Sequence, residues 1–177
     1  RTTGDLGLEK DTHLPGFYSI GFKNAAPYEY AGPGRWNDPD MLVVGLVGWG
    51  PTLHPTRLTP SEQYTHITLW SLLAAPLLIG CDLTKLDPFT TSLLSNDEVL
   101  EVNQDALGRQ ASRVAVTPNT EVWAKDMEDG SKAVGLFNRS EKPQQVPVLW
   151  KDLGLSGTLA VRDLWRQLDL RAQKDSF

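Results

Sequence analysis

The sequence is poor in the residues that several classes of protein need. It has one cysteine, Cys81, so no intrachain disulfide can form. Its 17 basic residues against 22 acidic ones give a net charge of −5, without a basic cluster, which argues against a nucleic-acid partner. The longest apolar run, residues 72–80, is too short to cross a bilayer, so no membrane insertion is expected. The three histidines, His13, His54 and His66, share no metal-ligand spacing, and we expect no metal or other cofactor.

Apolar residues, by contrast, are plentiful. They make up 40% of the chain and include six tryptophans, which is ample for a packed core and excludes a disordered chain. Over residues 1–108, short aliphatic runs alternate with helical patterns, as they do in βα units. Over residues 109–177, short alternating segments separated by turn signals are typical of antiparallel strands. The sequence therefore predicts an α/β part followed by an antiparallel β domain.

Three stretches of the α/β part carry signals for the start of a helix. In TPSE, residues 59–62, the threonine can cap a helix, the proline suits its first position and the glutamate completes a capping box. Apolar residues follow at helical spacing, and the helix is expected to end near Ala75, before Pro76. A second helical stretch opens at DP, residues 87–88, and SNDE, residues 95–98, forms a second capping box.

Strand signals lie on both sides of residue 108. Residues 77–80 are apolar and too few for a helix, and they predict a parallel strand covered on both faces. Residues 121–125 and 132–137 flank EDGS, in which Asp-Gly supplies a hairpin turn. Residues 158–161 predict one more strand. Pro143 and Pro147 favour an edge strand or a loop around Val146 and Val148.

Several aspartates follow the probable strands of the α/β part: Asp5, the pair Asp38 and Asp40, and Asp82. In a (β/α) barrel, side chains at the C-terminal ends of the strands gather around one mouth, where chemistry occurs. Carboxylates brought together there can act as acid, base or nucleophile. Asp38 is expected to fix its loop through hydrogen bonds and Asp82 to be structural. The neighbouring Trp36 is expected to pack in the core.

Four segments in order along the chain carry a resemblance to a known family. The chain resembles family 27 of the glycoside hydrolases, the α-galactosidases and α-N-acetylgalactosaminidases. The resemblance runs continuously to about residue 108 and loosely to the end, and WNDPDML is its most specific motif. The four segments are RTTGD (1–5), AGPGRWNDPDML (31–42), LWSLLAAPLLIGCDL (69–83) and VNQD (102–105), the last followed by LG at 107–108.

This resemblance implies a (β/α)8 barrel with a C-terminal antiparallel β-sandwich-like domain, and a retaining mechanism that removes terminal α-linked galactose. It implies that Asp5, in an Arg-x-x-x-Asp motif, is the general acid/base, which protonates the departing oxygen and then deprotonates the attacking water. Arg1 would contact the sugar or the nucleophile, and Asp40 and Met41 would line the sugar site. The implied partner is a carbohydrate, and a secreted or periplasmic location is favoured. The oligomeric state stays open.

A retaining mechanism also needs a nucleophilic carboxylate roughly 5 Å from the acid/base. In the family it belongs to a Lys-x-Asp motif on an earlier strand, and no such motif precedes Arg1. The chain is therefore expected to hold the C-terminal strands and helices of the barrel over residues 1–108. Residues 109–177 would form the β domain without its last strand. Such a chain is expected to be inactive alone.

Two groups of alternatives remain open. Residues 46–55 form a longer loop than the family pattern, so the same fold acting on α-N-acetylgalactosamine, β-L-arabinopyranose or α-glucan stays possible. A rival of another class is a non-catalytic carbohydrate-binding or structural module, for which Trp123, Trp150 and Trp165 are available as stacking residues. We expect these tryptophans in the core of the β domain instead. A metal-dependent hydrolase is disfavoured by the histidine spacing.

Overall fold

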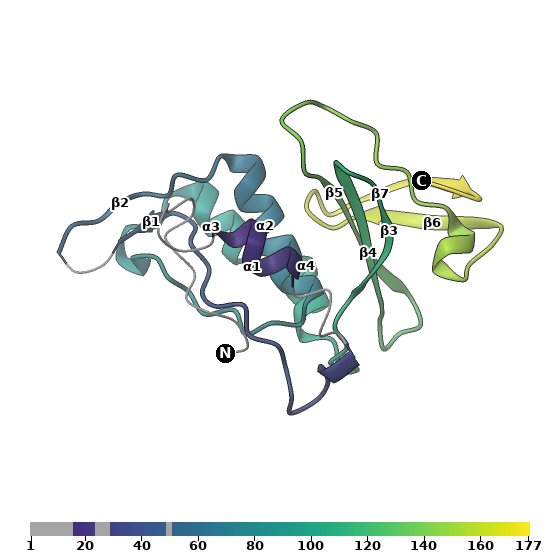
Figure 1. Cartoon of the computed structure of the whole chain (residues 1–177), viewed down its shortest axis with the longest axis horizontal. Helices are drawn as coiled ribbons and strands as arrows, with labels where there is room; N and C mark the ends of the chain where they lie inside the picture. The colour runs from purple at the N-terminus through teal and green to yellow at the C-terminus, as the bar shows by residue number, and fades with distance from the viewer. Residues whose placement is uncertain (1–15, 24–28, 49–50) are drawn as a thin grey trace.

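The computed structural model describes residues 16–23, 29–48 and 51–177. Its elements are α1 (Phe17–Lys23), β1 (Leu46–Val47), β2 (His54–Pro55), α2 (Pro60–Leu72), η2 (Leu83–Lys85), α3 (Pro88–Leu94), α4 (Asp97–Gln104), β3 (Ser112–Val116), β4 (Thr120–Asp126), β5 (Lys132–Asn138), η3 (Trp150–Leu153), β6 (Thr158–Asp163) and β7 (Leu168–Lys174). The helices α1 to α4 gather in one half of the molecule, and strands β3 to β7 in the other (Figure 1). None of the described helices combines the length and the apolar character needed to cross a membrane.

Helix α2 begins as the sequence predicts and ends earlier. The Thr59 hydroxyl accepts a hydrogen bond from the Glu62 amide at 3.3 Å, and the Thr59 amide donates to the Glu62 carboxylate at 2.8 Å. The helix ends at Leu72 instead of near Ala75. Ala74 has φ of +49°, and its amide and that of Ala75 donate to carbonyls of the last helical turn at 3.1 Å. This left-handed cap ends the helix before the proline is reached.

The next two helices have side-chain caps, one of which differs from the prediction. Asp87 caps α3 as expected, because its carboxylate accepts from the Thr90 amide at 2.7 Å. The cap of α4 is Asn96, which accepts from the Val99 amide at 3.1 Å, so the predicted capping box starting at Ser95 is wrong. Ser95 instead closes the end of α3, where its hydroxyl donates to a carbonyl of that helix at 2.8 Å.

The predicted parallel pairing is present over a short stretch. The Leu42 amide donates to the Leu78 carbonyl at 2.7 Å, and the Gly80 amide donates to the Leu42 carbonyl at 3.0 Å, around a parallel bridge between Leu42 and Ile79. However, Leu78 is 52% exposed and Ile79 is 46% exposed. The prediction of a strand covered on both faces is therefore wrong here, because the described part of the chain leaves about half the surface of each of these two side chains uncovered.

Strand β4 is the central strand of a three-stranded sheet and is buried on both faces. It lies between β3 and β5 in an antiparallel sheet. Glu121, Trp123 and Lys125 face the helices, where Trp123 belongs to the core shared with α1 and α2. Val122 and Ala124 face a second cluster formed with η3 and β6. The alternating side chains of one strand thus join two hydrophobic cores.

The β domain contains the predicted hairpin and the predicted later strand, together with two strands, β3 and β7, that were not predicted. β4 and β5 pair through the predicted Asp-Gly turn, where Gly130 has φ of +84°. β6 covers the predicted strand at residues 158–161 and pairs with β7, which the sequence pattern did not indicate. Residues 143–147 form a loop, and beyond it Val148 and Phe177 exchange two backbone hydrogen bonds at 2.9 and 3.0 Å.

The helical half and the sheet are in direct contact. A Cβ placed on Gly135 of β5 would overlap Cδ1 of Leu72 in α2 and would lie 2.8 Å from the ring of Phe137. The amide of Ala111, just before β3, donates to the Leu72 carbonyl at 2.8 Å. Only glycine permits this close approach of helix and strand.

A buried carboxylate lies in this joint. Glu121 is 1% exposed and pairs with Arg139 and, at 3.7 Å, with Arg113. It also accepts from the Trp123 indole at 2.9 Å, and the Arg139 guanidinium lies 4.5 Å from the ring centroid of Phe22 in α1. Two guanidinium groups and an indole thereby compensate the burial of the charge.

The tryptophans are distributed differently from the prediction. Trp123 and Trp150 are buried, as expected for the cores of the β domain. Trp165 packs against the outside of α2, where its indole donates to the Thr68 hydroxyl at 2.8 Å. Trp36 is 46% exposed, so its predicted place in the core is wrong.

Candidate functional site

The structure describes two of the four predicted site residues. Arg1 and Asp5 lie outside the described residues. Asp40 and Met41 lie directly before the parallel bridge at Leu42, in the loop that carries the WNDPDML motif. Both side chains are partly exposed.

The Asp38-Pro39-Asp40 loop is held by its own carboxylates. The Asp38 carboxylate accepts from the Asp40 amide at 2.9 Å, and the Asp40 carboxylate accepts from the Met41 amide at 2.9 Å. Asp40 has φ of +80°, a conformation in which aspartate is one of the few tolerated residues besides glycine. The predicted role of Asp38 in fixing the loop is therefore confirmed. These contacts orient the Asp40 side chain relative to its backbone.

Met41 crosses the neighbouring segment at a glycine. A Cβ on Gly80 would lie 2.7 Å from the Met41 sulfur and 2.7 Å from the Leu42 carbonyl oxygen. Any larger residue at position 80 would therefore displace Met41. The end of the Leu77–Gly80 segment and the Asp40 loop thus lie side by side, as the barrel arrangement predicts.

Helix α2 contacts the same loop with two buried side chains. The Trp70 indole donates to the Asp40 carbonyl at 2.7 Å, and Nε2 of His66 accepts from the Val43 amide at 3.1 Å. Both side chains are fully buried, and their rings meet edge to face at 4.2 Å. The sequence alone assigned neither residue a role at the site. The sequence signal that could have pointed to these two residues is their spacing of one helical turn on a helix with a predicted cap.

His66 makes stability depend on pH. Burial lowers the pKa of His66 from 6.5 to about 3, so the folded protein keeps the ring neutral where the unfolded chain binds a proton. Stability is thus full above pH 6.5 and declines as the pH falls toward 3. We expect the urea midpoint to fall between pH 6.5 and about 5.3, a window that lies above most of the titration of the carboxylates.

The matched variants for this prediction are His66→Gln and His54→Gln. The first keeps a hydrogen-bond acceptor but cannot titrate, so its urea midpoint should be nearly independent of pH over this window. The second removes a histidine from the β1–β2 hairpin and should keep the slope of the parent protein. A wild-type slope in His66→Gln would show that other groups cause the pH dependence.

Asp82 has the structural role that was predicted. Its carboxylate accepts from the amide of Thr84 at 2.9 Å and from the hydroxyl of Thr84 at 2.6 Å, which caps η2. These hydrogen bonds lower the pKa of Asp82. Within the described ranges, no group of three or more His, Cys, Asp or Glu side chains is arranged to hold a metal ion.

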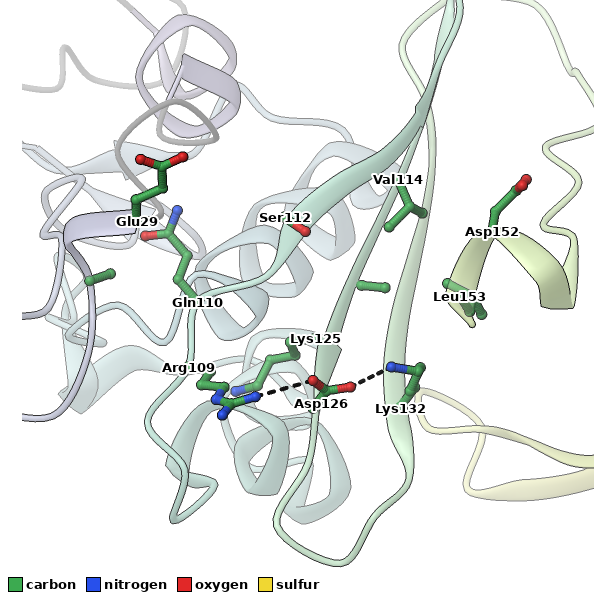
Figure 2. Close-up of a pocket in the computed structure, with 12 residues that line it drawn as sticks. Glu29, Arg109, Gln110, Ser112, Val114, Lys125, Asp126, Lys132, Asp152 and Leu153 are labelled. Carbon is green, nitrogen blue, oxygen red and sulfur yellow. Dashed lines mark hydrogen bonds and ion pairs between the residues drawn. The ribbon is translucent and has the colours of Figure 1, made fainter. Parts of the chain in front are cut away.

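A cavity of about 420 Å³ lies elsewhere, between the helical half and the β domain (Figure 2). Inside it, Asp126 pairs with Lys132 and, at 3.2 Å, with Arg109. The hydrogen bond from Lys132, supported by Arg109, lowers the pKa of Asp126 and keeps it ionised. Lys125 donates to a carbonyl at the end of α4, and burial lowers the pKa of Lys125. The lining, which includes none of the predicted site residues, is Glu29, Ala31, Arg109, Gln110, Ser112, Val114, Ala124, Lys125, Asp126, Lys132, Asp152 and Leu153.

Comparison with known proteins gives the class. A family model described as α-galactosidase A matches residues 19–105, and one described as the C-terminal β-sandwich domain of α-galactosidase matches residues 117–177. The chain belongs to the α-galactosidase family, which is family 27 of the glycoside hydrolases. The fold class is also confirmed: part of a (β/α)8 barrel followed by an antiparallel β-sandwich domain. The division at residue 108 stays a prediction.

Individual relatives support this placement. The chain is 43% identical to an α-galactosidase of Cyamopsis tetragonoloba over 167 residues, which is 93% of this chain and 38% of that protein. A crystal structure of a β-L-arabinopyranosidase from Geobacillus stearothermophilus matches 91% of this chain and 38% of its own, with 37% identity and a TM-score of 0.84. A crystal structure of α-galactosidase I from Mortierella vinacea matches 99% of this chain and 48% of its own, with 26% identity and a TM-score of 0.87. The chain spans about two fifths of the length of the curated relatives that it matches.

Proposed function

We propose that the protein is a retaining glycosidase that removes terminal α-linked galactose from oligo- or polysaccharides. The observation that carries this proposal is the Asp40 loop. A partly exposed carboxylate is held in a left-handed backbone conformation at the end of a barrel segment, beside Met41. Strained residues of this kind cluster at functional sites. The names of the curated relatives support α-galactose as the sugar.

In the proposed mechanism each residue has one role. Asp5 protonates the departing glycosidic oxygen and later takes a proton from the attacking water. Asp40 accepts hydrogen bonds from sugar hydroxyls, and Met41 forms an apolar wall beside it. Arg1 supplies a fixed positive charge that favours ionised carboxylates nearby. The nucleophile is a further carboxylate on an earlier barrel strand.

We propose that activity requires more of the barrel than this sequence contains. The support is the share of the relatives that the chain spans, about two fifths of their length. A retaining mechanism needs two carboxylates about 5 Å apart, and Asp5 is the only one of the two that is assigned to this chain. The chain by itself should therefore show no turnover, whereas the complete polypeptide should be active.

A panel of nitrophenyl glycosides tests the proposed substrate. The complete polypeptide is assayed with α-D-galactoside, α-N-acetyl-D-galactosaminide, β-L-arabinopyranoside and α-D-glucoside, and kcat/KM should be highest for the α-D-galactoside. Detection of α-galactose as the first-formed product, by NMR, tests retention. No turnover of the α-galactoside would overturn the proposal.

A second candidate is β-L-arabinopyranosidase activity. The matched structure from Geobacillus stearothermophilus carries that name at 37% identity. A β-L-arabinopyranoside has the ring configuration of an α-D-galactoside without the C6 hydroxymethyl group, so the two activities differ at one part of the pocket. A kcat/KM at least ten-fold higher for the arabinopyranoside in the same panel would favour this candidate.

A non-catalytic carbohydrate-binding module is the rival of another class. The tryptophans considered for stacking on a sugar have other contacts. Trp123 and Trp150 are buried, and the indole of Trp165 donates a hydrogen bond to Thr68. Calorimetric titration of the chain by itself with galactose distinguishes the two. Binding in the micromolar range by the chain alone would favour the module, and negligible binding is expected for part of a pocket.

A further inference from the structure

Helix α2 carries a row of buried polar side chains that all contact one segment of backbone. Trp70 donates to the Asp40 carbonyl at 2.7 Å, His66 accepts from the Val43 amide at 3.1 Å, and the Gln63 side chain accepts from the Gly45 amide at 3.4 Å. Positions 63, 66 and 70 lie on one face of the helix. We call these three residues the α2 polar row. Successive turns of α2 thus contact successive parts of the segment from residue 40 to residue 45.

Each member of the α2 polar row is itself fixed in place. Gln63 also donates to the Leu58 carbonyl at 3.1 Å and is 6% exposed. The Trp70 ring is packed against His66 and against α1, where a Cβ on Gly21 would lie 2.7 Å from Cζ3 of the indole. The indole has one donor and no freedom to turn it elsewhere. The row is therefore a rigid support for the loop.

Asp40 needs such support because of its backbone. Its φ of +80° is sparsely populated outside glycine and persists only where the surroundings hold it. The hydrogen bonds within the loop, from the Asp40 and Met41 amides, leave the Asp40 carbonyl to be held from another element. The Trp70 indole makes that contact, from thirty residues away in the sequence.

We infer that Trp70 is a positioning residue for the Asp40 carboxylate. By holding the carbonyl of Asp40, the indole fixes the peptide plane, and with it the direction in which the side chain points toward the sugar. Gln63 and His66 hold the segment beyond it in register. The inference rests on the proposed function for the role of Asp40, although the geometric part of it can be measured without any substrate.

The geometric part is tested by hydrogen exchange in the complete polypeptide. Trp70→Phe keeps the aromatic body and deletes the donor. The amides of Asp40 and Met41 should then exchange at least about ten-fold faster, because the loop opens more often. Trp165→Phe is the matched control: it deletes an indole bond of 2.8 Å to the same helix, at Thr68, and should leave these two amides unchanged. Unchanged exchange in Trp70→Phe would overturn the inference.

The functional part is tested by a double-mutant cycle on the nitrophenyl α-galactoside. Trp70→Phe should raise KM about ten-fold with a smaller change in kcat, whereas Trp165→Phe should change neither. In an Asp40→Asn background, Trp70→Phe should add little, because the carboxylate that it positions is gone. An undiminished effect in that background would overturn the inference.

The two tests separate the inference from the proposed function. A wild-type protein that turns over no glycoside contradicts the proposed function, and the exchange measurement still decides whether Trp70 holds the loop. If Trp70→Phe does not fold, site-specific replacement of Trp70 by its benzothiophene analogue exchanges the N–H for sulfur within a ring of nearly the same shape. The exchange rates and the KM are then expected to change in the same directions.

Discussion

Replacing Asp5 with asparagine is expected to lower kcat/KM for an alkyl α-galactoside by about 10²–10⁴-fold in the complete polypeptide. An amide cannot give a proton to the departing oxygen, and an alkoxide is a poor leaving group without one. A nitrophenolate leaves readily without protonation, so the first step with a nitrophenyl α-galactoside should suffer much less. Steady-state kinetics with both substrates measure this difference.

The control for Asp5→Asn is Asp82→Asn. Asp82 caps η2 through Thr84 and has no assigned contact with the sugar, so its variant should keep kcat within about two-fold of the parent. Equal losses of kcat/KM on the alkyl and the nitrophenyl substrates in Asp5→Asn would contradict the acid/base role, because kcat/KM reports the step in which the leaving group departs. They would indicate that Asp5 acts on binding or on the fold.

Replacing Trp123 with alanine is expected to lower the free energy of unfolding by about 3–5 kcal/mol. The side chain is fully buried between the sheet and the helices, with its ring edge to face against Phe22 and Phe137 at 6.1 and 6.4 Å. Its loss leaves a cavity in the joint and removes one donor from buried Glu121. Urea unfolding followed by circular dichroism measures the change.

Two further variants make this result decisive. Trp36→Ala is the matched control: Trp36 is 46% exposed, and the expected change is below about 1 kcal/mol. Trp123→Phe retains an aromatic ring and should be destabilised less than Trp123→Ala, which keeps the test readable if the alanine variant does not fold. Equal losses in Trp36→Ala and Trp123→Ala would contradict the burial that the structure assigns to the two residues.

The elements that sequence reasoning predicted correctly are those with a local cause. The cap at Thr59 and the cap at Asp87 depend on contacts three residues away, and the turn at Gly130 depends on a conformation that glycine adopts freely. Asp38 belongs to the same group, because the hydrogen bond that fixes its loop reaches only two residues along the chain. Such contacts are visible in the order of the residues.

The predictions that failed depend on distant parts of the chain. Trp36 and the Leu78-Ile79 pair are apolar and were placed in the interior, yet all three are exposed at between 46% and 52%. Conversely, Glu121 and Lys125 are charged and nearly completely buried. Arg139 forms an ion pair with Glu121, and a carbonyl at the end of α4 accepts a hydrogen bond from Lys125. Whether a side chain is buried depends on the residues that cover it in the folded chain, and the neighbouring sequence does not show which residues these are.

The candidate site shows the same difference between what the sequence reveals and what only the folded chain reveals. The order of four short segments was sufficient to place the chain among the α-galactosidases and to select Asp5, Arg1, Asp40 and Met41. It was not sufficient to find the support of the loop by α2, because a tryptophan or a histidine at helical spacing looks like any core residue. The distance of 2.7 Å between the Trp70 indole and the Asp40 carbonyl exists only in the folded chain.

By itself, the amino-acid sequence of this protein determined its family, the starts of α2 and α3 and its hairpin turn. The tertiary structure alone decided which charges are buried, which tryptophans are covered and which helix holds the Asp40 loop. The physical reason is range. Caps and turns are made by neighbours in the chain, whereas burial and the orientation of a functional carboxylate are set by side chains that folding brings together from far apart.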